Sequence, residues 1–134
     1  MDEIIRVQPD KERARSLIKM AKSRLEVIQT LNDEKQSFLI VEGYYEVAKE
    51  LVTSILLIDG YKTLSHKDLL EYLEINLKKE FSRIDIELLN QFRVLRNKIV
   101  YYGEQIEPSY IKRNKKHILD IISKLLEICE RKLK

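Results

Sequence analysis

Five polar side chains in the second half of the chain have types and a spacing suited to chemistry. They lie within the stretch LLNQFRVLRNKIVYYG and are Arg93, Arg96, Asn97, Tyr101 and Tyr102. An arginine guanidinium is permanently charged and binds phosphate through paired hydrogen bonds, while asparagine and tyrosine add donors that could contact a ribose or give up a proton. We therefore expect a site for an anion such as a phosphate group. Its first candidate ligand-binding residues are Arg93, Arg96 and Tyr102.

The nature of residue 101 limits the catalysis that this stretch supports. A tyrosine, with an ordinary pKa near 10, is a poor general base at neutral pH, unlike a histidine with a pKa near 6.5. Efficient proton transfer by Tyr101 would require a strongly lowered pKa. The chain has two histidines, His66 and His117, and neither is surrounded by metal-ligand residues. We interpret both as structural or exposed, expect no metal and no cofactor, and keep His66 as a reserve catalytic candidate.

A helix must position the candidate residues. An apolar stripe at three- and four-residue steps predicts its core face, formed by Leu88, Phe92, Leu95, Ile99 and Tyr102. Gly103 is suited to the position just beyond the end of the helix. A second stripe beside the first contains Leu89, Arg93, Arg96 and Val100. We interpret this stripe either as ordinary solvated surface or as a contact with an anion or a second subunit, and its exposed aliphatic side chains predict a homodimer.

The whole chain has the composition of a helical protein. It has 134 residues, 44% of them apolar, with only three glycines and two prolines. This balance favours long helices over a sheet. Patterns and capping signals predict helices over residues 9–31, from 38 to just before Gly60, over 63–79, from about 84 to 102, and from Pro108 onward. We expect one all-α domain over residues 1–134, an up-and-down bundle of four long helices and one shorter helix.

Two segments resemble the HEPN superfamily of small helical-bundle proteins. They are RNKIVYYG, residues 96–103, and EGYYEVAK, residues 42–49, which continues through Gly60 to His66. The resemblance implies a HEPN-like bundle, an antiparallel dimer, metal-independent RNA cleavage and a nucleotidyltransferase-type antitoxin as partner. The ribonuclease motif of that family is an arginine, four to six residues, and then a histidine. In this chain Arg96 and Asn97 match the motif, but Tyr101 stands at the histidine position. The resemblance therefore implies RNA or a nucleotide as the ligand and Arg96, Asn97 and Tyr101 as the candidate catalytic residues of a degenerate motif.

Charge outside this stretch adds one further candidate surface. The net charge of +3 neither requires nor excludes nucleic acid. The densest basic cluster is KRNKKH, residues 112–117, from which Lys112 and Arg113 are further ligand-binding candidates. We interpret the carboxylates of Glu42 and Glu46 as a solvated face, or alternatively as partners of the arginines on the signature helix. The longest apolar run is short, so we expect a cytoplasmic protein without a membrane segment.

Three functions follow from these patterns. The first is a HEPN-like nucleotide- or RNA-binding homodimer with a degenerate ribonuclease site, which is our main expectation. The second is an active metal-independent ribonuclease toxin in which Tyr101 replaces the histidine. The third is a module that binds a protein partner through the Arg96 stripe and takes no small ligand. Whether the chain is an enzyme stays open at this level.

Overall fold

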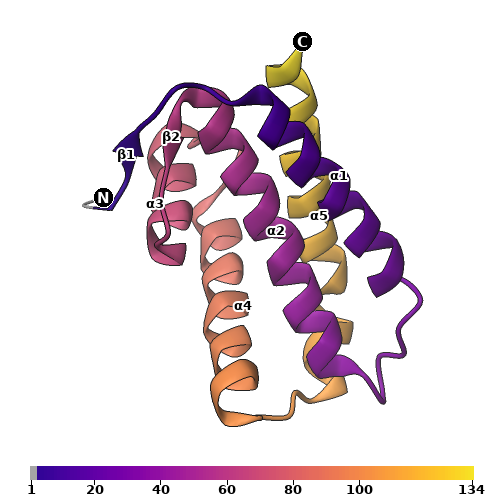
Figure 1. Cartoon of the computed structure of the whole chain (residues 1–134). Helices are drawn as coiled ribbons and strands as arrows, with labels where there is room; N and C mark the ends of the chain where they lie inside the picture. The colour runs from indigo at the N-terminus through magenta and orange to yellow at the C-terminus, as the bar shows by residue number, and fades with distance from the viewer. Residues whose placement is uncertain (1–2) are drawn as a thin grey trace.

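The chain is mostly helical. The structure, a computed structural model, describes residues 3–134. Along the chain these form β1 (Ile5–Arg6), α1 (Lys11–Ile28), α2 (Ser37–Asp59), β2 (Tyr61–Lys62), α3 (His66–Asn76), α4 (Arg83–Tyr102) and α5 (Pro108–Leu133). Helices α1 and α4 run antiparallel to α2 and α5, and α5 lies behind α2 in the view of Figure 1. None of the helices within residues 3–134 is long and apolar enough to cross a membrane.

Helix α2 is the centre of the bundle. It packs against each of the other four helices, with α1 on one side and α4 on the other (Figure 1). This position explains its sequence, which is apolar on most of its circumference and has fourteen buried residues. The largest of its buried side chains are Tyr44 and Tyr45. Side chains from all five helices join one continuous core around α2.

Local capping signals set most of the helix ends. Helix α4 begins with a capping box, in which Ser82 and Asp85 satisfy each other's backbone N–H groups. It ends at Gly103, whose φ of 64° is in the left-handed region that glycine tolerates best. Pro108 opens α5 as expected. Helix α1 begins after the predicted residue 9, because the side chain of Asp10 accepts the backbone N–H of Arg13 and caps the helix there, and it ends at Ile28, before the predicted residue 31.

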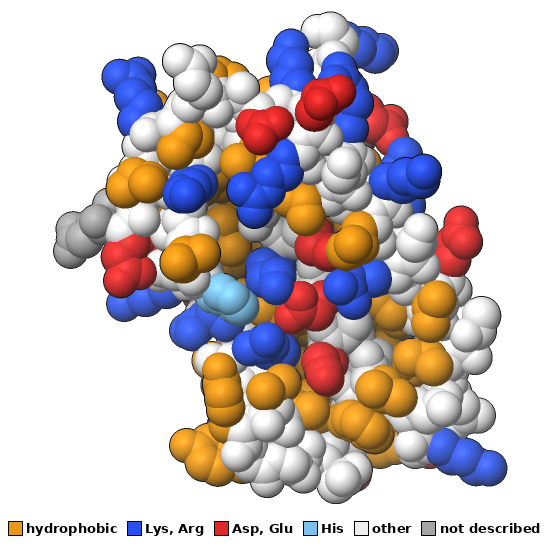
Figure 2. Space-filling model, in the orientation of Figure 1, with side chains coloured by type: hydrophobic (Ala, Val, Ile, Leu, Met, Phe, Trp, Pro, Cys, Tyr) orange, Lys and Arg blue, Asp and Glu red, His pale blue; other side chains and the backbone are white. Residues whose placement is uncertain are grey.

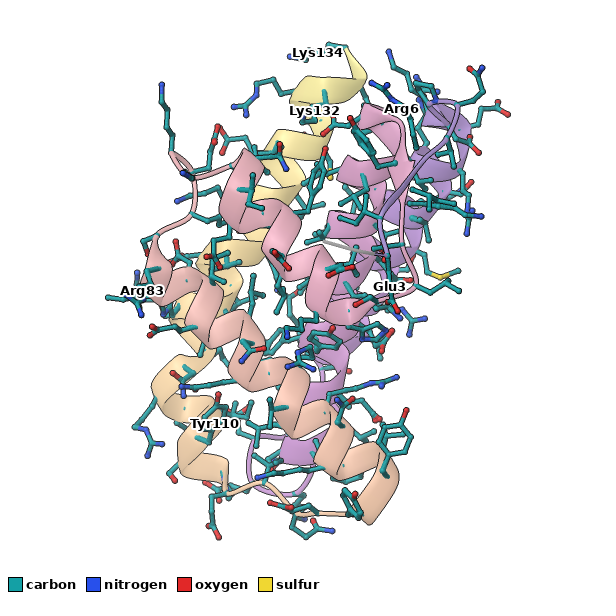
Figure 3. All side chains as sticks on the ribbon, turned by 90° about the vertical axis from the view of Figure 1, so that its left-hand side faces the viewer. Glu3, Arg6, Arg83, Tyr110, Lys132 and Lys134 are labelled. Atoms are coloured by element: carbon teal, nitrogen blue, oxygen red, sulfur yellow. The ribbon has the colours of Figure 1, made fainter. Side chains whose placement is uncertain are left out.

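The sheet was not anticipated from the sequence. β1 and β2 form a two-residue antiparallel pair with Ile5 opposite Lys62 and Arg6 opposite Tyr61. The backbone N–H of Glu3 donates to Asp68 Oδ2 at 3.1 Å, which ties the N-terminal segment to α3. Figure 3 marks Glu3 and Arg6 on this side of the molecule. β2 lies between α2 and α3 in the chain, and Ser65 then caps the start of α3.

Two assignments on α4 were wrong. Tyr102 was placed on the core face, but 81% of it is exposed, because the last turn of α4 extends beyond the neighbouring helices. Leu89 was placed beside the charges as an exposed residue, but it is fully buried. Helix α4 packs against α2, α3 and α5, so its buried surface is wider than a single stripe. Of the two aliphatic residues that predicted a dimer, only Val100 is exposed.

Candidate functional site

Six polar residues come together where α2, α3 and α4 meet, and we call them the His66 cluster. Its members are Tyr45, Glu46 and Lys49 from α2, His66 from α3, and Arg93 and Arg96 from α4. Hydrogen bonds, ion pairs and electrostatic effects on the His66 pKa connect them. Figure 2 shows basic and acidic side chains gathered in the middle of this face, with a histidine ring beside them and hydrophobic side chains below.

Arg96 lies at the junction of α2 and α4. Its Nε is 3.5 Å from Glu46 Oε1, and its Nη1 donates to Asn97 Oδ1 at 3.3 Å. The Nε atom is buried, and the contact with Glu46 lacks hydrogen-bond geometry, so Nε has no hydrogen-bond partner within residues 3–134. The Glu46 carboxylate offsets the charge of Arg96, but the buried N–H at Nε has no acceptor. This is costly, because water has been removed from the donor without a replacement. An anion at this position would satisfy Arg96.

Glu46 holds two cations at once. Besides Arg96 it contacts Lys49, with its Oε2 2.7 Å from the ammonium nitrogen. For Glu46, this bears out the alternative in which the carboxylates of α2 meet arginines of the signature helix; for Glu42 that alternative is not borne out. Arg93, one turn before Arg96, is anchored by Asn90, whose Oδ1 accepts from Arg93 Nε at 3.0 Å. The cluster contains three cationic side chains, Lys49, Arg93 and Arg96, and one carboxylate, Glu46. Its net charge is therefore positive.

His66 is joined to the buried Tyr45. The Tyr45 hydroxyl and His66 Nδ1 are 2.9 Å apart, and the two rings are tilted with centroids 5.6 Å apart. The sequence correctly placed Tyr45 in the core, and a buried hydroxyl requires a partner. Ser65 caps α3 immediately before His66 by accepting the backbone N–H of Asp68. The cap and Tyr45 together fix both the backbone and the ring of His66.

The surroundings of His66 favour its neutral form. Burial lowers the pKa of its imidazole, and the charges of Lys49, Arg96 and Arg93 lower it further, while Glu46 acts in the opposite direction. Burial also raises the pKa of the Tyr45 hydroxyl far above its ordinary value. The pair therefore consists of a neutral imidazole and a protonated tyrosine at neutral pH. A neutral imidazole beside several cations is suited to accepting a proton.

The other candidate residues on α4 lie toward its end. Asn97 contacts Arg96 directly, whereas 69% of Tyr101 is exposed, in the last turn of the helix together with Tyr102. The structure thus brings Arg93, Arg96 and Asn97 to one place and leaves the two tyrosines projecting from the helix end. Val100 and Leu39, both exposed, lie near them and line a shallow groove of about 450 Å³ that also reaches Arg96.

The basic cluster at the start of α5 is engaged elsewhere. Lys112 forms an ion pair with Glu34, and Lys115 forms one with Asp33 at 2.6 Å. Both carboxylates belong to the loop between α1 and α2, so these lysines fasten that loop to α5. Arg113 is exposed on the same helix. The pairing shows a structural role for Lys112, and the structure does not join it to the His66 cluster.

A second, larger hollow of about 1090 Å³ lies between α3 and α4. Its charged lining residues are Lys67, Glu71, Glu74, Lys78, Arg83 and Glu87. Figure 3 shows this side of the molecule, with Arg83 at one end. Acidic and basic groups are balanced there and no histidine contributes, so its chemistry is less distinctive than that of the His66 cluster. Within residues 3–134 no three His, Cys, Asp or Glu side chains are grouped so as to hold a metal ion.

Comparisons with known proteins leave the site to be interpreted from its own residues. A scan against family models, a search of curated proteins and a search of solved structures each find no match to this chain. Sequence reasoning identified Arg93, Arg96 and Asn97 but did not assign Lys49 or Tyr45 to the site, and it held His66 only in reserve. The one available signal was a histidine directly after a helix cap, in a chain with only two histidines.

Proposed function

We propose that the His66 cluster binds the phosphate groups of a nucleotide or of RNA. The observation that carries this proposal is the buried Arg96 Nε without a hydrogen-bond partner, at a place where Lys49 and Arg93 add positive charge. Arginine recognises phosphate through two parallel hydrogen bonds, and excess positive charge attracts polyanions. The resemblance of residues 96–103 and 42–49 to the HEPN superfamily supports the same ligand class and a HEPN-like arrangement of the helices.

The binding test compares two arginines on the same helix. Fluorescence anisotropy with a labelled single-stranded RNA measures affinity for the wild type, Arg96→Gln and Arg83→Gln. Arg83 is a matched control because 93% of its side chain is exposed, at the opposite end of α4, where it pairs with Glu87. We expect Arg96→Gln to lose most of the affinity and Arg83→Gln to keep it. Equal losses in both variants would indicate nonspecific attraction and contradict the proposal.

Salt dependence gives a second readout of the same site. Each phosphate contact on a single strand contributes roughly 0.7 to the slope of log affinity against log salt concentration. Removing Arg96 should therefore reduce the magnitude of this slope by about that amount. A slope that is unchanged in Arg96→Gln would show that Arg96 does not contact phosphate.

We also propose that the chain forms a homodimer through the exposed residues near the end of α4. Leu39 and Val100 are exposed and line the groove that reaches Arg96. Tyr101 and Tyr102, the two residues after Val100, are exposed in the last turn of α4. Such a patch beside charged groups is typical of an interface between copies of one chain. Light scattering should give twice the monomer mass for the wild type and the monomer mass for Val100→Asp. A monomeric wild type at tens of micromolar would contradict the dimer.

A further inference from the structure

One member of the cluster is at odds with a site that takes any anion. The carboxylate of Glu46 lies beside Arg96, with its Oε1 3.5 Å from Arg96 Nε, and both residues line the groove of about 450 Å³. An ionised carboxylate only accepts hydrogen bonds, so it repels a ligand that also only accepts them. A site that had to attract anions of every kind would bind them more tightly without Glu46.

Glu46 is held in this position by a second contact. Its Oε2 is 2.7 Å from the ammonium nitrogen of Lys49, three residues later on α2. Only 18% of the Glu46 side chain and 20% of the Arg96 side chain are exposed, so their charges interact more strongly than in bulk water. Glu46 Oε1 does not receive a hydrogen bond from Arg96 Nε. The site therefore places a fixed acceptor beside a cationic donor.

The rest of the groove lining supports the same division between donors and acceptors. Its other arginine, Arg24 of α1, already donates from Nε to Glu50 Oε1 at 2.9 Å, so Arg96 is the arginine of the groove with an unpaired Nε. Glu42, one turn before Glu46 on α2, adds a second carboxylate to the lining. A ligand in this groove meets carboxylates as well as guanidinium groups, and it must satisfy both.

We propose that Glu46 makes the site selective for an oxyanion that brings its own hydrogen-bond donor. This donor is a proton on the phosphate itself or a hydroxyl group next to it. The inference rests on the phosphate-binding function proposed above and names the ligand class of the same site. Arg96 donates to an oxygen of the ligand, and Glu46 Oε1 accepts from the donor of the ligand. An oxyanion without a donor leaves two acceptors facing each other with no proton between them, and the site rejects it.

The experiment uses two ions that differ in this one property. Phosphate and sulfate are both tetrahedral oxyanions, but at neutral pH phosphate carries at least one proton and sulfate carries none. NMR titrations of the whole chain that follow the Arg96 Nε–H signal at constant ionic strength give the dissociation constants for the wild type, Glu46→Gln and Glu87→Gln. Glu87→Gln is a matched control because it removes the same charge at an exposed position near the start of α4, where Glu87 pairs with Arg83.

The expected result is a change in selectivity as well as in affinity. The wild type should bind phosphate about tenfold or more tightly than sulfate, because the hydrogen bond to the Glu46 carboxylate forms with phosphate alone. In Glu46→Gln the amide can donate as well as accept, so sulfate should gain affinity and the preference should fall to about threefold or less. Glu87→Gln should keep the preference of the wild type.

A second pair of ligands identifies the donor. Adenosine 3′-phosphate has a hydroxyl next to its phosphate, and 2′-deoxyadenosine 3′-phosphate lacks it. Tighter binding of the first by the wild type, with the difference lost in Glu46→Gln, assigns the donor to the neighbouring hydroxyl. Equal binding of the two, with phosphate still preferred over sulfate, assigns the donor to the proton on the phosphate.

The possible failures are distinguishable. Sulfate that binds the wild type as tightly as phosphate would overturn the selectivity and leave the anion site standing. Equal gains for both ions in Glu46→Gln would show that Glu46 is only a competing charge, which also overturns the proposal. If neither ion binds the wild type, the phosphate-binding function fails as well. If Glu46→Gln does not fold, the comparison of the two ions in the wild type decides alone.

Discussion

Replacing Gly43 by alanine tests how closely α1 and α2 approach beside the groove. Gly43 lies in the N-terminal half of α2, and a Cβ added there would lie 2.7 Å from both Cδ1 and Cγ1 of Ile28, the last residue of α1. Carbon atoms in contact prefer separations of about 3.5–4.0 Å, so Ile28 must move by roughly 1 Å. Overpacking of this kind costs about 1–3 kcal/mol, whereas alanine gains about 1 kcal/mol over glycine in a helix. We expect Gly43→Ala to lower the free energy of unfolding by about 1 kcal/mol.

A double-mutant cycle isolates the clash from the helix propensity. Ile28→Ala removes both of the clashing atoms and should itself cost about 2–5 kcal/mol, because Ile28 is buried. In that background the added methyl group has room, so Gly43→Ala should become stabilising by about 1 kcal/mol. Urea unfolding followed by circular dichroism measures all four free energies. A stabilising effect of Gly43→Ala in the wild-type background, or an equal effect in both backgrounds, would refute the close approach of the two helices.

Substitutions at three other positions test His66 and the two ends of α4. The pKa of His66 is lower in the folded chain than its unfolded value of about 6.5. The contribution of His66 to the free energy of unfolding is therefore complete above that pH and is lost as the pH falls below it. Urea titrations between pH 7 and 5 should show this loss in the wild type and a smaller loss in His66→Asn. Burial acts to raise the pKa of Asp85, but hydrogen bonds from His117 and Ser82 lower it overall. Asp85→Asn should therefore lower the free energy of unfolding by about 1 kcal/mol at pH 7. This difference between wild type and variant should shrink below about pH 4. Gly103→Ala places a side chain at a φ of 64° and should cost about 1–2 kcal/mol in thermal unfolding, while Gly103→Asn should cost less. An Asp85→Asn difference that persists unchanged at pH 3, or a neutral Gly103→Ala, would contradict these assignments.

The helices could be predicted because their signals are local. Ser82 and Asp85 form a capping box within one turn, and Gly103 and Pro108 act on the residues next to them. Each signal depends on the backbone within about four residues, which a sequence displays directly. The two-residue sheet depends instead on contact between Ile5 and Lys62, residues far apart in the chain. No pattern within either segment indicates this pairing.

The candidate site was predictable only in the part that one helix contributes. Arg93, Arg96 and Asn97 share a face of α4, so their spacing alone associates them. His66 reaches them because α3 folds back against α2 and α4, which is a consequence of the packing of the whole bundle. Tyr45 was correctly interpreted as core, but the partner of its hydroxyl could not be inferred without the tertiary structure. The pattern of α4 also could not show that the bundle ends before Tyr102.

The most direct test of the central claim follows the ring of His66 by NMR as inorganic phosphate is added. The account predicts a His66 pKa below the ordinary value of about 6.5 in the free protein and a rise in that pKa when an anion occupies the cluster. The ring signals of His117, which pairs with Asp85, should not respond to phosphate and serve as the internal control. The rise at His66 should be absent in Arg96→Gln. A His66 ring that does not respond to phosphate, or that responds equally in Arg96→Gln, would contradict an anion site at this cluster.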